Sequence, residues 1–293
     1  MNTATDFDSF INQAWSDHAV DAAGVADRLA GPGLALATGV AQVAPLAMLI
    51  HHVYGEHLAR WRDGDALLQR LLPLADAAGV AALGRCRASL ALCAGTDDPR
   101  PALSASDRIR VGAMAAAALA ERDTPRAAAW FRQALDEAEG AELPAADPVN
   151  RALAVTANNL ACTLETKTGR SPAERALMIE SAQAGRRFWA LAGTWLETER
   201  AEYRLAMTWL QAGDPAQARR HARQCLEIVQ ANDGPALERF FAWEAIGVVE
   251  RAAGDLASHQ QALARARDAF AGLSEGDRGW CQAELDKLAA AET

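Results

Sequence analysis

The sequence has little of what β-sheet and disulfide-stabilised proteins need. Only two of its 293 residues are tyrosine, and no run of Val, Ile, Thr and aromatic residues alternates with polar residues between turn signals. The five cysteines are scattered, odd in number and without a Cys-x-x-Cys pair, so they predict neither a disulfide framework nor a zinc or redox motif of that kind. Such thiols fit a reducing cytoplasm.

Several functional signatures are also missing. There is no glycine-rich phosphate loop after a strand, no Gly-x-Ser-x-Gly and no His-Glu-x-x-His. The N-terminus is acidic and no apolar segment with a cleavage site follows it, so no secretory signal is visible. Lys and Arg total 29 against 38 Asp and Glu, a net charge of −9 that disfavours nucleic-acid binding. We expect a cytoplasmic, non-enzymatic protein that needs no cofactor and binds neither nucleic acid nor membrane.

What is abundant is alanine, the best helix former, which supplies 70 residues. Ser171-Pro172 and Asp214-Pro215 each place a capping side chain before a proline suited to the first helical position, and two further pairs of this type occur at Thr124 and Asp147. The pattern predicts an all-α fold. The expected helices cover residues 105–122, 125–139, 148–168, 172–191, 195–211, 214–231, 235–253, 255–272 and 276–291.

The first hundred residues carry weaker signals. Helical apolar spacing covers residues 6–19, 21–30, 34–62, 65–77 and 80–94. The proline-containing segment 96–101 either separates an N-terminal helical region, residues 1–104, from an array over 105–293, or is only a long loop between helices. Residues 29–55 lack Asp, Glu, Lys and Arg, but they contain glycines, prolines and two histidines, which favours a central helix of a soluble core over a membrane span.

A helix–turn–helix pattern recurs along the second part of the chain. Each copy has a bulky residue followed by a small one in its first helix, and Gly213-Asp214 and Gly254-Asp255 mark two of the turns. The bulky and small pairs are Met114 and Ala115, Leu160 and Ala161, Leu205 and Ala206, and Ile246 and Gly247. This pattern resembles the tetratricopeptide repeat (TPR) family. The spacings of 46, 45 and 41 residues exceed the ~34 residues of the standard repeat.

The resemblance implies a right-handed α-solenoid of helical hairpins that ends in a C-terminal capping helix. The long spacings and the segment 156–164 resemble the kinesin-light-chain type of array, and residues 1–104 would be degenerate repeats or a separate region. In this register Ala206 and Gly247 lie where the paired helices cross, facing small residues such as Ala218 and Ala266, so a large side chain would separate the helices.

A TPR-like array typically binds a protein or peptide in the concave groove formed by its first helices. The groove candidates in the shared register are Asn158, Glu165, Arg200, Tyr203, Met207, Glu244 and Arg251. The alternative is that these residues are solvated or form salt bridges between repeats. The positions that hold a terminal carboxylate in chaperone-binding relatives differ here, so that activity is not expected.

A histidine-rich segment gives the only metal candidates. His52 and Glu56 are four residues apart and share a helix face, a spacing that can supply two ligands. In an α-helix His51 and His57 point away from that face, and His18 is a distant third candidate. A partly buried polar helix end explains the segment better than a metal site.

The sequence thus favours a scaffold that binds a protein or peptide in a groove. A sensor or regulatory module for a small peptide or metabolite is the alternative, and a metal-dependent helical enzyme is the least favoured class. Neither the partner nor the oligomeric state can be read from the residues.

Overall fold

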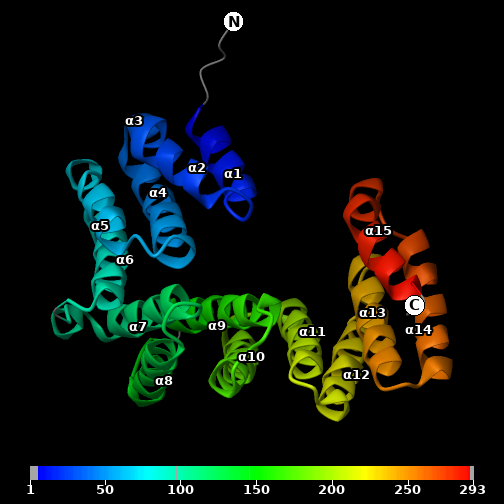
Figure 1. The fold of residues 1–293 in the computed structure, drawn as a ribbon. Coiled ribbons are helices and arrows are strands. Elements are labelled where there is room, and N and C mark those ends of the chain that lie inside the picture. The colour runs from blue at the N-terminus through cyan, green and yellow to red at the C-terminus, as the bar shows by residue number, and fades with distance from the viewer. Residues whose placement is uncertain (1–5, 97, 145, 291–293) are drawn as a thin grey trace, which may run out of the picture. The chain divides into compact units, whose positions relative to one another are not determined.

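The computed structural model describes residues 6–96, 98–144 and 146–290, and every regular element over these residues is helical (Figure 1). This agrees with the all-α prediction from the alanine content. Helix packing divides the chain into two compact units, Met1–Val149 and Asn150–Thr293.

The first unit contains eight α-helices and five short 3-10 or π-helical segments within its described residues. The α-helices are α1 Phe7–Asp17, α2 Ala22–Arg28, α3 Leu34–Leu36, α4 Val43–Ile50, α5 Trp61–Gln69, α6 Ala77–Ala94, α7 Ala105–Leu119 and α8 Thr124–Gly140. The short segments are η1 Leu29–Gly33, η2 Val40–Gln42, η3 His51–His57, η4 Leu72–Leu74 and η5 Arg100–Ala102, of which η1 and η3 are π-helices.

The single helix expected over residues 34–62 is wrong, because the structure breaks it twice. Gly39 adopts an extended backbone, and the Gln42 side chain accepts hydrogen bonds from the backbone N–H groups of Thr38 and Gly39. After α4 the chain widens into the π-helix η3 and leaves the helical region at Ala59, whose φ is 53°. The predicted helix is therefore three pieces: α3, the continuous run of η2, α4 and η3, and the first two residues of α5.

The core of the first unit lies around α4 and α6. Leu46, Ile50, Leu83 and Cys86 are completely buried. By length and composition α6 could span a membrane, with a mean hydropathy of 1.3, but half of it is buried against other parts of the protein. Core helices commonly have this character.

The segment around Pro99 and Pro101 is attached to the first unit. The guanidinium of Arg100 is almost completely buried, pairs with Asp98 at 2.8 Å and reaches Glu137 of α8 at 3.5 Å. It also lies 4.2 Å from the ring centre of Trp130. The possible boundary near residue 104 thus falls inside a compact unit that continues to Val149.

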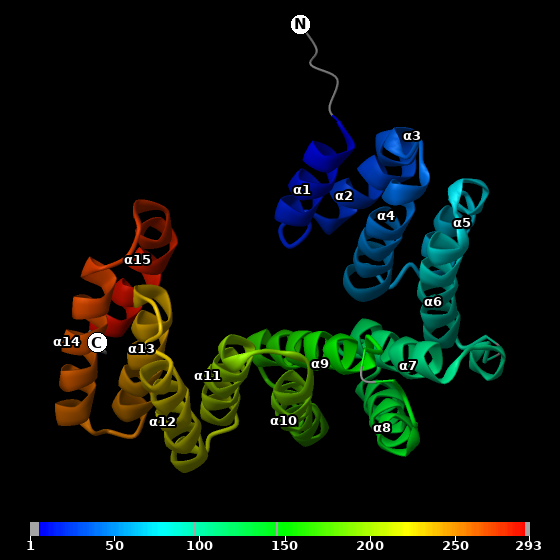
Figure 2. The same ribbon diagram turned by 180° about the vertical axis from the view of Figure 1, so that it is seen from behind.

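The second unit is a series of helices in which chain neighbours pack together (Figures 1 and 2). Its helices are α9 Val149–Thr166, α10 Pro172–Ala192, α11 Trp195–Gln211, α12 Pro215–Ala231, α13 Ala236–Ala252, α14 Leu256–Ala271 and α15 Glu275–Ala289. The predicted ranges agree with these helices to within two residues at each end. The last helix, α15, packs on both α13 and α14.

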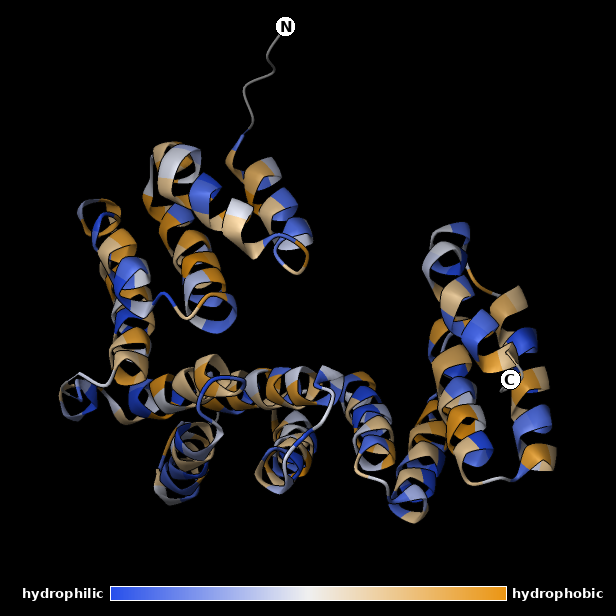
Figure 3. Cartoon of the chain, in the orientation of Figure 1, coloured by the Kyte–Doolittle hydropathy of each residue, from blue (hydrophilic) through white to orange (hydrophobic). Residues whose placement is uncertain are grey.

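The capping residues explain this agreement. Ser171 accepts a hydrogen bond from the backbone N–H of Glu174, whose carboxylate accepts one from the N–H of Ser171. Asp214 caps α12, as predicted. The helix α8 begins one residue earlier than expected and is capped by Asp123. Apolar and polar residues alternate around the helices of both units (Figure 3), as expected of helices with one packed face.

The small residues predicted at helix crossings are buried. Ala206 packs with Ala218 and Ala222 in one apolar cluster. A β-carbon at Gly247 would lie 3.5 Å from the β-carbon of Ala262 and only 2.8 Å from Leu288. The sequential packing and these close crossings are compatible with a helical repeat.

Candidate functional site

The predicted groove residues of α11 contact α13. The Arg200 guanidinium pairs with Glu238 at 2.6 Å, and the Tyr203 hydroxyl donates to the Glu244 carboxylate at 3.1 Å. Burial raises the pKa of Glu244 to about 7, although the hydrogen bond from Tyr203 opposes this shift. Burial, aided by the charge of Glu244, raises the pKa of Tyr203 well above its ordinary value.

Other groove candidates make similar connections between first helices. Glu165 of α9 accepts from Arg204 at 2.5 Å and from the Thr208 hydroxyl, both on α11. Arg251 of α13 donates to the carbonyl oxygens of Lys287 and Leu288, at 2.9 and 3.2 Å, near the end of α15.

The two remaining candidates differ. Met207 packs against the apolar cluster around Ala206. The side-chain amide of half-buried Asn158 donates over long distances, 3.4 Å to Oδ1 of Asn159 and 3.8 Å to the Cys162 sulfur. Most of the seven residues therefore link one first helix to the next. Their role in ligand binding stays a prediction.

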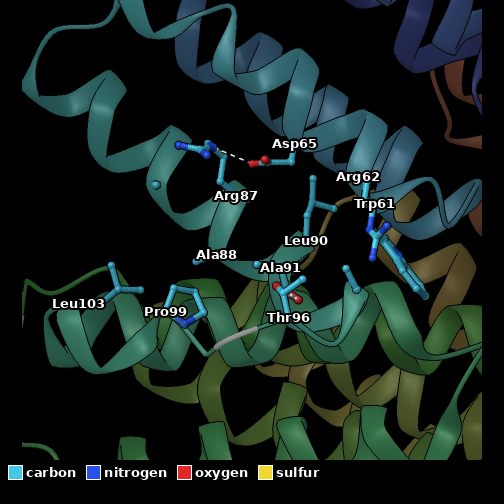
Figure 4. Close-up of a pocket in the computed structure, with 12 residues that line it drawn as sticks. Trp61, Arg62, Asp65, Arg87, Ala88, Leu90, Ala91, Thr96, Pro99 and Leu103 are labelled. Carbon is cyan, nitrogen blue, oxygen red and sulfur yellow. Dashed lines mark hydrogen bonds and ion pairs between the residues drawn. The ribbon is translucent and has the colours of Figure 1, made fainter.

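A cleft of about 350 Å³ lies in the first unit, between α5, α6 and the segment that follows α6. Figure 4 shows Trp61 and Arg62 at one end of this cleft and Pro99 and Leu103 at the other. The cleft is lined by Trp61, Arg62, Asp65, Gly84, Arg87, Ala88, Leu90, Ala91, Ala94, Thr96, Pro99 and Leu103. Its volume is that of sites that hold small ligands or single side chains.

Among the residues that the structure describes, one positive charge of the cleft has no partner. Arg87 pairs with Asp65 at 2.7 Å, and this pair is drawn in Figure 4. Arg62 is exposed and has no hydrogen-bond or ion-pair partner in the part of the chain that the structure describes. A guanidinium in this state favours an anionic ligand group such as a carboxylate or a phosphate.

The cleft continues into a second depression. This one has a volume of about 330 Å³ and shares Trp61, Arg62 and Ala94 with the first. It is also lined by Ala59, a non-glycine residue at positive φ, a conformation often found near binding sites. The two depressions therefore adjoin at Trp61, Arg62 and Ala94.

Sequence reasoning missed this cleft. Its only local signal is a row of small residues, Gly84, Ala88 and Ala91, at helical spacing on α6. A row of small side chains leaves space along one face of a helix, but small residues also occur at ordinary helix crossings. The walls of the cleft come from α5 and from the segment around Pro99, whose positions depend on the fold.

The structure places the metal candidates His52 and Glu56 in direct contact. Nδ1 of His52 lies 2.9 Å from the Glu56 carboxylate. Burial alone would raise the pKa of Glu56, but the His52 hydrogen bond and the nearby histidine charges lower it overall. His51 is buried beside the Ser89 hydroxyl at 2.9 Å, and burial lowers its pKa to about 4. Glu56 therefore orients His52, and His51 is a neutral core residue.

Comparisons of the chain with protein-family models, with curated proteins and with solved structures find no match. The functional argument therefore depends on the geometry of this chain.

Proposed function

We propose that the protein is a helical-repeat binding protein and that its cleft holds the C-terminal end of a peptide whose last side chain is apolar. The observation that carries this proposal is the combination of a largely apolar cleft with the guanidinium of Arg62, which has no partner among the described residues. An apolar terminal side chain would enter the cleft beside Leu90 and Leu103. The terminal carboxylate would pair with Arg62.

The continuation of the cleft favours a peptide over a small metabolite. Two depressions that share Trp61 and Arg62 offer more length than one small acid can fill. An extended backbone crossing Trp61 would use both. Repeat proteins commonly bind extended partners in this way.

The overall architecture we propose is a right-handed, TPR-like solenoid. The support is the packing of successive helices from α10 to α15, together with the buried small residues Ala206 and Gly247 at the crossings. In this proposal the contacts of Arg200, Tyr203 and Glu165 hold successive first helices together. A cytoplasmic location fits the free thiols of Cys86, Cys93, Cys162, Cys225 and Cys281.

Direct peptide binding tests the proposal. A fluorescein-labelled hexapeptide ending in Ala-Leu with a free carboxylate is titrated with the purified full-length protein, and polarisation is measured. We expect saturable binding that weakens by roughly tenfold or more when the peptide ends in an amide, since a charge-assisted hydrogen bond contributes about 1.5–3 kcal/mol. No saturable binding, or equal affinity for acid and amide, contradicts the proposal.

Two variants locate the binding site. Gly84 lines the cleft, and a β-carbon there would meet nothing within 4 Å, so Gly84→Leu fills the cleft while keeping α6 intact. Arg62→Glu reverses the charge, and Arg175→Glu at an exposed position of α10 is its matched control. We expect the first two variants to abolish binding and the control to retain it. Acetyl-leucine binding as tightly as the hexapeptide would instead identify a small-acid sensor.

A further inference from the structure

Three histidine side chains meet where the end of α1 contacts η3 in the first unit. One nitrogen each from His18, His52 and His57 lies within 4.8 Å of the other two. The Nε2 atoms of His52 and His57 are 3.1 Å apart. In a tetrahedral zinc site with Zn–N bonds of 2.0–2.1 Å, two nitrogens lie about 3.3 Å apart. We propose that these three imidazoles bind one divalent transition-metal ion such as Zn²⁺.

The outer partners of two rings prepare them for this role. Nδ1 of His18 lies 2.6 Å from the carbonyl oxygen of Trp15, and because a carbonyl only accepts, this nitrogen carries the hydrogen. Nδ1 of His52 donates in the same way to the Glu56 carboxylate at 2.9 Å. Both rings are thereby fixed in the tautomer that has its lone pair on Nε2, and in His52 this lone pair faces Nε2 of His57 at 3.1 Å. Metal-binding histidines almost always have such a partner on the other nitrogen.

The π-helix η3 is what brings His52 and His57 together. In an α-helix residues five apart point about 140° away from each other, whereas the wider π-turn aligns them. Side chains outside η3 donate hydrogen bonds to two of its carbonyl oxygens. Trp61 Nε1 donates to the Gly55 oxygen at 3.2 Å, and Arg122 donates to the His57 oxygen at 3.1 Å. π-Helices are rare and often occur at functional sites.

The ligand set determines the class of ion. Neutral imidazoles suit zinc, copper, nickel and cobalt, whereas magnesium and calcium prefer oxygen ligands. Glu56 supplies negative charge from behind His52 and is not needed as a ligand. The three rings are only partly buried, and Trp15 beside them is exposed, so water can complete the coordination.

Metal binding would tie α1 to the rest of the first unit. His18 directly follows α1, while His52 and His57 belong to η3. An ion held by all three would close a loop between these elements and restrain α1. This effect distinguishes the site from a plain aromatic cluster of the same rings with Trp15, in which an added ion would change nothing.

The test uses the untagged full-length protein after removal of metal with a chelator. It is titrated with ZnCl₂ by calorimetry and with CoCl₂ by visible absorption. We expect one ion per chain, a dissociation constant in the micromolar range or below, and cobalt absorption typical of four or five ligands. Binding that is absent or that lacks a defined stoichiometry overturns the proposal.

Variants identify the ligands. His18→Gln and His57→Gln should each weaken zinc binding by more than about 100-fold, and Glu56→Gln, which changes only an outer partner, by about 10- to 100-fold with unchanged stoichiometry. His221→Gln in the second unit is the matched control and should bind zinc like the wild type. Equal affinity in the wild type and both ligand variants overturns the proposal.

Hydrogen exchange provides a readout that does not depend on the variants folding. In the wild-type protein zinc should slow amide exchange over α1 and leave α12 unchanged. Unchanged exchange over α1 at saturating zinc means that the ion is held elsewhere and overturns the assignment of His18.

Discussion

At the scale of single residues, Glu244 shows how burial reverses the usual preference of a carboxyl group. It is almost completely buried in α13, and its partner, the Tyr203 hydroxyl, is a neutral donor. Arg251 and Lys287 act on it only through their charge and make no ion pair with it. The fold therefore favours the protonated form, and the pKa is about 7.

This pKa predicts a pH-dependent stability. Between the pKa of an unfolded glutamate, about 4.3, and the folded value, the folded state keeps a proton that the unfolded state releases, so the free energy of unfolding falls as pH rises through this window. Glu244→Gln keeps an acceptor for Tyr203 and removes the titration. We expect the fall in unfolding free energy from about pH 5 to about pH 8, measured with urea, to be smaller in the variant by about 2–3 kcal/mol.

The control for this measurement is Glu227→Gln at an exposed position of α12. It should change the pH profile by no more than a few tenths of a kcal/mol. If Glu244→Gln and Glu227→Gln give the same profile as the wild type, the buried carboxyl is not the source of the pH dependence.

At the scale of helices, the boundaries could be predicted because capping is local. The residues that begin α10 and α12 are recognisable within a few positions of sequence, and the structure places them as caps. The π-helix η3 could not be predicted, because it depends on Trp61 and on Arg122 in the turn between α7 and α8, which lies 65 residues beyond the carbonyl it binds. For the same reason the α-helical pattern wrongly separated His52 from His57. The cleft along α6 could not be predicted either, because its walls come from α5 and from the segment around Pro99, whose positions depend on the fold.

Close helix crossings lead to a prediction at this scale. Gly247→Arg would place a charged side chain where even a β-carbon lies 2.8 Å from Leu288, and Ala206→Arg would do the same in a completely buried cluster. We expect each change to lower the free energy of unfolding by about 3 kcal/mol or more through overpacking and charge burial. The measurement is urea unfolding followed by circular dichroism.

The matched control is Ala264→Arg on the exposed face of α14. It adds the same side chain without a crossing and should stay within about 0.5 kcal/mol of the wild type. An unchanged stability in Gly247→Arg or Ala206→Arg would show that the repeat register is wrong at that position.

At the scale of the whole molecule, two proline-containing segments are candidates for the boundary between the compact units. The segment near Pro99 has the stronger sequence signal, but Arg100 fixes it by its contacts with Glu137 and Trp130. The connection between α8 and α9 has no comparable buried anchor among its described residues, and the division into compact units falls at its end. The composition of both segments predicts a loop. The long-range contacts of Arg100 are what distinguish the segment near Pro99 from the connection between α8 and α9.

This difference predicts where the folded chain is cut. Glu142 is exposed and lies outside helices, so a glutamate-specific protease should cleave after it before any other site. Arg100 should resist trypsin, because cleavage there requires release of a buried guanidinium. Mass spectrometry of brief digests should therefore show two fragments, one that ends at Glu142 and one that begins at Leu143. The variant Glu142→Gln should slow their appearance. If Arg100 is cut as fast as Glu142 is, its contacts do not hold the first unit together.

If the fragment that begins at Leu143 keeps its helical circular dichroism and unfolds cooperatively, the second unit is an independent folding unit.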